Sequence, residues 1–172
     1  MLAPLLAAKK ARPHARVGYY NYPQCANEMH CYQLPLGTNA TAVNDDMAWL
    51  FAASTAVFPA IYFEFVRHTG PGPIVREAER LARRFSAGSP VLPVWWYYGC
   101  DKFRRLCNQS NVAAQWEQAA GAGASGVVVW GESVNTTTMH QLQPGDVGCH
   151  QFAEYATRVI GPAAKLFVAN RL

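Results

Sequence analysis

Four short apolar and aromatic runs, each with turn-forming residues nearby, are the most regular feature of the chain. They cover Arg16–Tyr22, Val57–Glu64, Pro90–Tyr98 and Gly126–Glu132. Short runs of this kind, bounded by turn residues and rich in Val, Tyr and Trp, are typical of buried β-strands. We therefore predict four strands.

A helical pattern follows each predicted strand. Residues 73–88 begin with Pro and end with Gly, which are favourable helix boundaries. One face of this segment carries Ile74, Ala78, Leu81, Ala82 and Phe85. Three more helices are predicted over residues 45–56, 111–123 and 147–161, with Asn44, Ser110 and Asp146 as their N-caps.

The order strand–helix, repeated four times, predicts parallel strands joined by crossover helices. No Gly-x-Gly-x-x-Gly follows a strand and no P-loop is present, so a nucleotide-binding sheet is not indicated. We predict an α/β fold: a partial (β/α) TIM-like barrel of about four βα units, formed by residues 1–172 as one domain-sized piece.

Polar and aromatic residues gather where the predicted strands end, which is where βα barrels carry their active sites. These candidates are Tyr20, Tyr22, Tyr62, Glu64, Tyr97, Tyr98, Asp101, Trp130 and Glu132. Aromatic faces stack on sugar rings, and tyrosine hydroxyls hydrogen-bond to sugar oxygens. Alternatively, the same aromatic residues close the barrel end as packing.

Charge adds little to this picture. The net charge is +4, and the cations fall into three groups, Lys9–Arg16, Arg76–Arg84 and Lys102–Arg105, rather than one stripe. We expect no nucleic-acid partner, although a basic surface can attract a polyanion. The five histidines are scattered without metal-ligand spacing, so no metal and no cofactor is expected. No apolar run is long enough to span a membrane.

Five cysteines and three Asn-x-Ser/Thr sequons, at Asn39, Asn108 and Asn135, point to a secretory history. The N-terminal stretch MLAPLLAAKKARPH places its positive charges after a short apolar run. A signal peptide has them before a longer run, so no signal peptide is predicted in this chain.

Four stretches of the sequence resemble the second half of the hyaluronidase catalytic domain, glycoside hydrolase family 56. They are RPHARVGYYNYPQC, NDDMAWLFAASTAVFPAIYF, VLPV and GAGASGVVVWG. The resemblance runs from about Arg12 to Phe167, in the order and spacing of the family. It implies a distorted βα barrel that cuts β-1,4 bonds of hyaluronan, and often of chondroitin, in a secreted or lysosomal protein.

The resemblance also implies a mechanism. A protonated Glu donates to the leaving oxygen, and the acetamido carbonyl of the substrate attacks the anomeric carbon, in place of a second carboxylate. By resemblance, Tyr20 and Tyr62 bind the substrate, and Tyr62 orients the acetamido group. Trp130 walls the acetamido pocket, and Asp101 falls where the family has an active-site Asp, although WWYYGCDKF departs from the usual strand sequence.

The general acid of the family lies in an Asp-x-Glu motif upstream of the tyrosine strand. No Asp-x-Glu occurs in these 172 residues. Asp45 and Asp46 open a predicted helix, where they complement its dipole. Glu64 and Glu132 lie at strand ends and could substitute as acids if burial raised their pKa. The expectation is a fragment with a substrate-binding wall and no recognised acid.

The cysteines agree with this expectation. By resemblance, Cys25 pairs with Cys31, and Cys100 with Cys107 can close a loop that only some relatives have. Cys149 is then unpaired, because its family partner lies near the start of the domain. An odd cysteine is what a missing N-terminal half would leave.

Three functions remain open from the sequence. The chain is the C-terminal half of a hyaluronidase-like glycosidase, or a non-catalytic remnant that binds glycosaminoglycan or a protein, or an unrelated α/β binding module. An Asp-x-Glu strand encoded upstream would favour the first.

Overall fold

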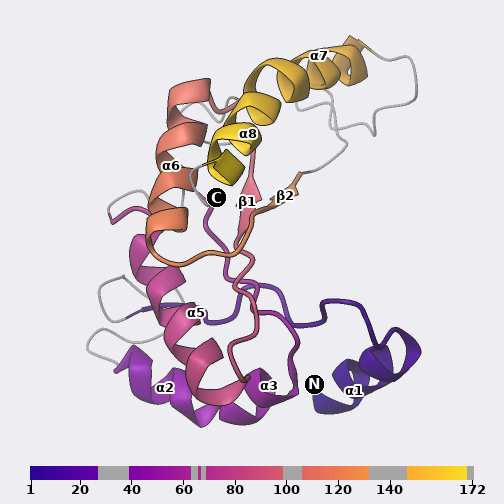
Figure 1. Ribbon diagram of the computed structural model, residues 1–172, viewed down its shortest axis with the longest axis vertical. Coiled ribbons are helices and arrows are strands. Elements are labelled where there is room, and N and C mark those ends of the chain that lie inside the picture. The colour runs from indigo at the N-terminus through magenta and orange to yellow at the C-terminus, as the bar shows by residue number, and fades with distance from the viewer. Residues whose placement is uncertain (27–38, 63–65, 67–68, 99–105, 132–146, 170–172) are drawn as a thin grey trace.

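The computed structural model describes residues 1–26, 39–62, 66, 69–98, 106–131 and 147–169, with the side chains of 147–149 excepted (Figure 1). The helices are α1 (Leu2–Ala11), α2 (Ala40–Asp46), α3 (Ala48–Ala53), α5 (Gly72–Phe85), α6 (Gln109–Gly121), α7 (Val147–Tyr155) and α8 (Gly161–Ala169). A π-helical segment, Ala156–Ile160, joins α7 to α8. The strands are β1 (Val94–Trp96) and β2 (Val128–Trp130).

Four extended segments lie side by side in chain order, and all of them are parallel. Tyr20 bridges Phe58, Val57 bridges Val91, and Ala60 bridges Val94. Strand β1 pairs with β2 from Val94–Val128 to Trp96–Trp130. The predicted parallel order is confirmed. The regular strands are much shorter than predicted, because the first two segments pair only through single bridges. That the four segments are part of a barrel stays a prediction.

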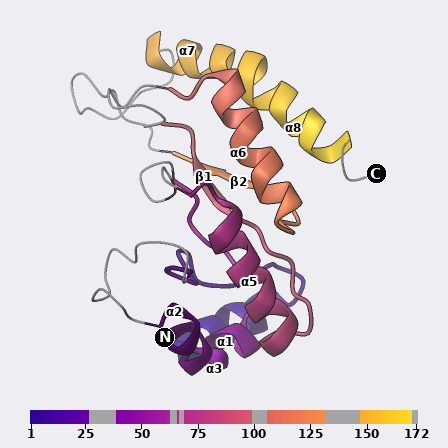
Figure 2. The same cartoon turned by 90° about the vertical axis from the view of Figure 1, so that its left-hand side faces the viewer.

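The main core lies between these segments and the helices that follow them. Figures 1 and 2 show α5 and α6 one after the other along one side of the strand segments, with α8 packed across α6. Trp95 is fully buried, meets the Trp116 ring edge-on at 5.4 Å, and donates to Gln115 Oε1 at 3.0 Å. No described helix has the length and apolar character needed to cross a membrane.

Helix α5 confirms the predicted apolar face. Ile74, Ala78, Leu81 and Ala82 are buried, and Phe85 packs against the core at its edge. The helix ends at Phe85, slightly before the predicted stop, because Ala87 and Gly88 both adopt positive φ (50° and 74°). A left-handed residue ends a helix, and glycine takes that conformation without a steric penalty.

Two of the predicted N-caps are wrong. Asn39, not Asn44, caps α2, and its side chain accepts from the Ala42 amide. Asn108, not Ser110, caps α6 by accepting from the Asn111 amide at 2.9 Å. In both cases the first turn begins earlier than the apolar periodicity suggested, because the amide side chain supplies the missing acceptor. Asp146 lies outside the described residues.

Asn44 instead belongs to a buried polar network between α2 and α5. Its Nδ2 donates to Glu77 Oε1 at 2.8 Å and to the Cys25 carbonyl at 3.0 Å. Arg80 donates to both Glu77 oxygens and to Asp45 Oδ1 at 2.7 Å. The hydrogen bond from Arg80 is the largest reason that the pKa of Asp45 lies below its usual value. Every polar group of this network therefore has a partner.

Candidate active site

Five aromatic side chains meet where the parallel segments end. They come from all four segments and are Tyr20, Tyr62, Trp96, Tyr98 and Trp130. We call this group the aromatic platform. Tyr20 and Trp130 are 48% and 42% exposed, and the other three are half-buried. Exposed aromatic rings gathered at one strand end make this surface the candidate binding site of the described residues.

Tyr62 lies at the centre of the platform. Its ring is 6.0 Å from Tyr20, 5.7 Å from Trp96 and 5.9 Å from Trp130, between centroids. The planes of Tyr62 and Trp130 differ by only 15°, so the two rings are offset-stacked. Centroid separations in this range are favourable for aromatic pairs. The rings therefore support one another and present a connected surface.

Strand alternation divides the four consecutive aromatic residues of β1 and its extension. Trp95 and Tyr97 point to the helices, where Tyr97 packs against Phe152 (4.8 Å) and Tyr155 (6.2 Å). Trp96 and Tyr98 point to the other face and join the platform. Tyr97 was predicted to be a site residue at the end of this strand, and that prediction is wrong. Trp96 was not singled out, although the two-residue period of a strand would have found it.

The first parallel segment, residues 16–22, is held in place on both sides of Tyr20. We call it the tyrosine segment. Before it, the Val17 amide donates to Thr55 Oγ1 at 2.7 Å. A side chain at Gly18 would collide with the Ala56 carbonyl, so only glycine fits there. After it, Asn21 has φ 64° and donates from its amide to the Phe58 carbonyl. Asn is one of the few residues that tolerate this conformation, and it turns the chain away while Tyr20 stays exposed.

The remaining predicted site residues divide into two groups. Tyr22 is half-buried against the core and is not part of the platform, because the chain turns at Asn21. Glu64, Asp101 and Glu132 lie outside the described residues, so their roles stay predictions.

Two of the described cysteines are oxidised. Cys25 and Cys107 each take part in a disulfide. The structure does not describe the side chains of the other three cysteines, Cys31, Cys100 and Cys149. The predicted pairs Cys25–Cys31 and Cys100–Cys107 therefore stay predictions. The Cys107 carbonyl accepts from the Tyr155 hydroxyl at 2.8 Å, and burial, followed by the nearby Tyr97, raises the pKa of Tyr155 to about 12. Tyr98 also forms an antiparallel bridge with Leu106, the residue before Cys107.

Comparison with known proteins gives the family. Residues 1–166 match the sequence profile of glycoside hydrolase family 56, described as hyaluronidase. The chain is 33% identical to hyaluronidase from Apis mellifera, over 96% of its own length and 44% of that protein. It is 31% identical to hyaluronidase from Dolichovespula maculata, over 92% of its length and 47% of that protein. A relative from Vespula vulgaris, 28% identical, is named inactive hyaluronidase B.

Solved structures agree with this. Bee venom hyaluronidase in complex with a hyaluronic acid tetramer superposes with a TM-score of 0.75 and 31% identity. The match covers 98% of this chain and 52% of that one, so the chain spans about half the length of the relatives it resembles. The profile match, the identity and the shared fold together place this chain in the hyaluronidase family, glycoside hydrolase family 56.

Proposed function

We propose that this chain forms the sugar-binding wall of a hyaluronidase-type glycosidase whose substrate is hyaluronan or chondroitin. The observation that carries the proposal is the aromatic platform, which collects rings from all four parallel segments at one end. Aromatic faces stack on the apolar faces of sugar rings, and Tyr hydroxyls bind their oxygens. The hyaluronic acid tetramer in the related bee venom structure supports this choice of ligand.

Within this proposal the residues have separate roles. Tyr62, at the centre of the platform, hydrogen-bonds to the acetamido group and orients it for attack on the anomeric carbon. Trp130, stacked beside it, forms the wall against which the acetamido group rests. Tyr20 holds a neighbouring sugar. Asp101 is proposed to stabilise the positive charge that develops on the acetamido group. The four parallel segments are then an arc of a (β/α) barrel.

Hydrolysis also requires a general acid. These 172 residues contain no Asp-x-Glu motif, and the fragment interpretation places that acid outside them. We propose that the platform binds and orients substrate, while bond cleavage depends on a carboxyl group that these residues do not supply. A non-catalytic binding protein is the second candidate, and the relative named inactive hyaluronidase B favours keeping it.

The proposed setting is the secretory pathway. Disulfides at Cys25 and Cys107 fit an oxidising compartment. Asn39 and Asn108 are exposed and remain candidate glycosylation sites, with Asn135 outside the described residues.

The test is binding of a hyaluronan hexasaccharide to the 172-residue chain, measured by titration calorimetry. Trp130→Ala should weaken binding about tenfold, the effect of losing one stacked ring. Trp49→Ala is the matched control, since Trp49 on α3 is 44% exposed and Trp130 is 42% exposed. Equal effects of the two substitutions would contradict the proposal. We expect no release of reducing ends in the same samples, and such release would show that these residues supply an acid themselves, against the proposal that the carboxyl group lies outside them.

A further inference from the structure

The net positive charge of the chain comes from its first segment. Residues 1–27 contain Lys9, Lys10, Arg12 and Arg16 and no acidic residue. The whole chain has 15 Lys and Arg and 11 Asp and Glu, so residues 28–172 hold 15 − 4 = 11 cations and 11 anions. The formal charge of +4 therefore equals the charge of this one segment.

The other described group of cations is largely neutralised by its own neighbours. On α5, Arg80 and Arg84 contact Asp45, at 2.7 and 2.5 Å, and Arg83 lies 3.4 Å from Glu79. In contrast, Lys10, Arg12 and His14 are exposed and form no ion pair with any residue that the structure describes.

Helix α1, which carries Lys9 and Lys10, is attached firmly to the site segment. Leu5 is 3% exposed, and Lys9 Nζ donates to the Ala53 carbonyl at the end of α3, at 2.9 Å. Tyr19, next to Tyr20, donates from its hydroxyl to the Met1 carbonyl at 2.7 Å. Both ends of the helix therefore have fixed positions relative to the aromatic platform. Lys9 is used in this attachment, which leaves Lys10, Arg12 and His14 available.

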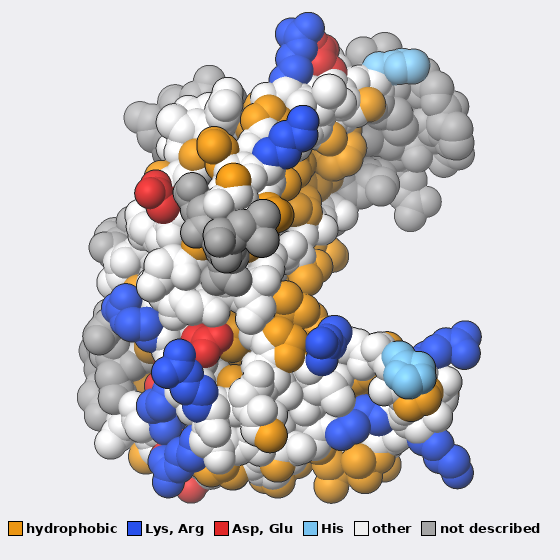
Figure 3. Space-filling view, in the orientation of Figure 1, with side chains coloured by type: hydrophobic (Ala, Val, Ile, Leu, Met, Phe, Trp, Pro, Cys, Tyr) orange, Lys and Arg blue, Asp and Glu red, His pale blue; other side chains and the backbone are white. Residues whose placement is uncertain are grey.

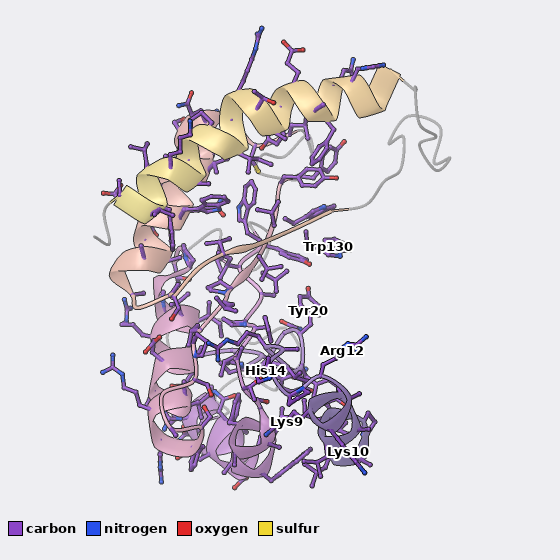
Figure 4. The ribbon with its side chains drawn as sticks, turned by 45° about the vertical axis from the view of Figure 1, so that its right-hand side comes forward. Lys9, Lys10, Arg12, His14, Tyr20 and Trp130 are labelled. Carbon is purple, nitrogen blue, oxygen red and sulfur yellow. The ribbon has the colours of Figure 1, made fainter. Side chains whose placement is uncertain are left out.

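The open side of the molecule brings the two features together. Figure 3 shows a hollow whose inner wall is largely hydrophobic and whose lower arm carries Lys, Arg and His side chains. In Figure 4, Trp130, Tyr20 and then Arg12, His14 and Lys10 follow one another down this side. Lys10 and Arg12, which have no ion pair among the described residues, and the neighbouring His14 thus continue the line of the exposed rings.

We propose that Lys10, Arg12 and His14 form a second binding surface that contacts carboxylates of a glycosaminoglycan chain extending beyond the aromatic platform. This inference rests on the proposed function. Hyaluronan carries a carboxylate on every second sugar, so a chain held by ring stacking at Trp130 and Tyr20 presents anions to any surface further along. This cationic arm, whose charges are Lys10 and Arg12 and which has no ion pair among the described residues, raises the local concentration of such a polyanion and favours one direction of the bound chain.

The chemistry separates the two surfaces. The aromatic platform needs sugar rings and acetamido groups and is insensitive to charge. The cationic arm needs carboxylates, and because its side chains are exposed, its contribution falls as salt is added. In the carboxyl-reduced derivative of a hyaluronan hexasaccharide, the carboxylates are converted to alcohols. It therefore keeps the groups that the platform needs and lacks those that the cationic arm needs.

The experiment measures binding of both oligosaccharides to the 172-residue chain by titration calorimetry at low and moderate salt. In the test variant, Lys10→Gln/Arg12→Gln, the native hexasaccharide should bind about three- to twentyfold more weakly at low salt. Its salt dependence should fall in parallel. The control, Arg83→Gln/Lys165→Gln, removes two exposed charges from α5 and α8 and should change affinity less than about twofold.

The two proposals fail in different ways. Unchanged binding of the native hexasaccharide by the test variant, or equal weakening of both oligosaccharides, overturns the cationic arm and leaves the platform standing. Failure of the wild-type chain to bind either oligosaccharide overturns both. Weakening confined to the native hexasaccharide, with Trp130→Ala weakening both, supports both. A circular dichroism spectrum like that of the wild type shows that the variants are folded.

Discussion

Asn44 and Glu77 are joined by a buried hydrogen bond of 2.8 Å between helices α2 and α5. Asn44 is 3% exposed and also binds the Cys25 carbonyl, so one amide connects both helices with the loop that follows the tyrosine segment. Asn44→Ala should lower the free energy of unfolding by about 1–3 kcal/mol, because the Cys25 carbonyl loses this donor and Glu77 keeps only its hydrogen bonds from Arg80. Urea unfolding measures this change.

Asp46 on the same helix is the control for this prediction. Its side chain is exposed, so Asp46→Ala should change stability by less than about 0.5 kcal/mol. Equal losses in the two variants would mean that helix propensity, and not the buried network, determines the stability of α2.

Gly18 is required by the close approach of the tyrosine segment to the next one. A Cβ at Gly18 would meet the Ala56 carbonyl and the Phe58 ring. Gly18→Ala should therefore destabilise the chain by about 1–3 kcal/mol, because the backbone carbonyl cannot move aside without breaking the pairing. Gly121→Ala, at the end of α6 where a Cβ meets nothing, should be neutral or stabilising by up to about 1 kcal/mol. Thermal unfolding of the two variants distinguishes them, and a neutral Gly18→Ala would contradict the packing argument.

Asn108 combines a sequon with a helix cap. Its Oδ1 accepts from the Asn111 amide at 2.9 Å and from Ser110 Oγ at 2.8 Å. Asn108→Asp keeps the side-chain oxygen that accepts the capping hydrogen bond but removes the amide nitrogen to which a glycan is attached. Asn108→Ala removes both atoms. We expect Asn108→Ala to cost about 0.5–2 kcal/mol in unfolding free energy and Asn108→Asp to cost much less.

Glycosylation at Asn108 is tested with the same variants expressed in a secretory host. If Asn108 carries a glycan, both variants lose the same mass relative to the wild type. A glycan occupies Nδ2 and leaves Oδ1 as the cap acceptor, so the two roles are compatible. An unchanged mass in both variants would rule out glycosylation at this asparagine.

Tyr155 should make the chain sensitive to high pH. Its pKa is raised from 10.0 to about 12, because its buried hydroxyl is more stable when protonated. Because the pKa of Tyr155 is higher in the folded state, its contribution to the free energy of unfolding is complete at pH values below about 10. This contribution is lost as the pH rises from about 10 to about 12. Tyr155→Phe should be less stable at neutral pH by about 0.5–1.5 kcal/mol, through loss of the hydrogen bond to Cys107.

The difference between the phenolate absorbance titrations of the wild type and Tyr155→Phe measures this pKa directly. In folded protein the difference should appear near pH 12, and in urea near pH 10. A difference already complete at pH 10 in folded protein would show that Tyr155 is not buried as the structure has it.

The sequence predicted which segments pair, because each short run of Val, Tyr and Trp needs cover on its buried faces. It did not predict how little of each segment is regular strand, because single bridges such as Tyr20–Phe58 depend on neighbours far away in the chain. The amphipathic pattern of α5 was sufficient to predict which face is buried, and it predicted the end of the helix to within a few residues. The caps of α2 and α6 were misplaced, since Asn39 and Asn44 are equivalent by residue type alone. Their partners in the fold distinguish them: Asn39 accepts from the Ala42 amide, and Asn44 donates to the buried Glu77.

The candidate site was predictable in composition and less so in orientation. Tyr20, Tyr62 and Trp130 were identified as strand-end residues, and the structure brings them together. Whether Trp96 or Tyr97 faces the platform depends on which alternate residues of the strand point to that side. Four consecutive aromatic residues give no polar and apolar alternation from which to predict this. The structure sets this orientation by packing Tyr97 against Phe152.

Burial divides four of the five tryptophans into two optical classes, with the half-buried Trp96 between them. Trp95 and Trp116 are 0% and 4% exposed, whereas Trp130 and Trp49 are 42% and 44% exposed. Blue-shifted emission that resists iodide therefore reports on the core, and red-shifted, quenchable emission reports on the surface. A sugar seated on Trp130 would shield that ring and leave Trp49 and the core pair unchanged. The chain therefore carries separate fluorescent reporters of folding and of occupancy.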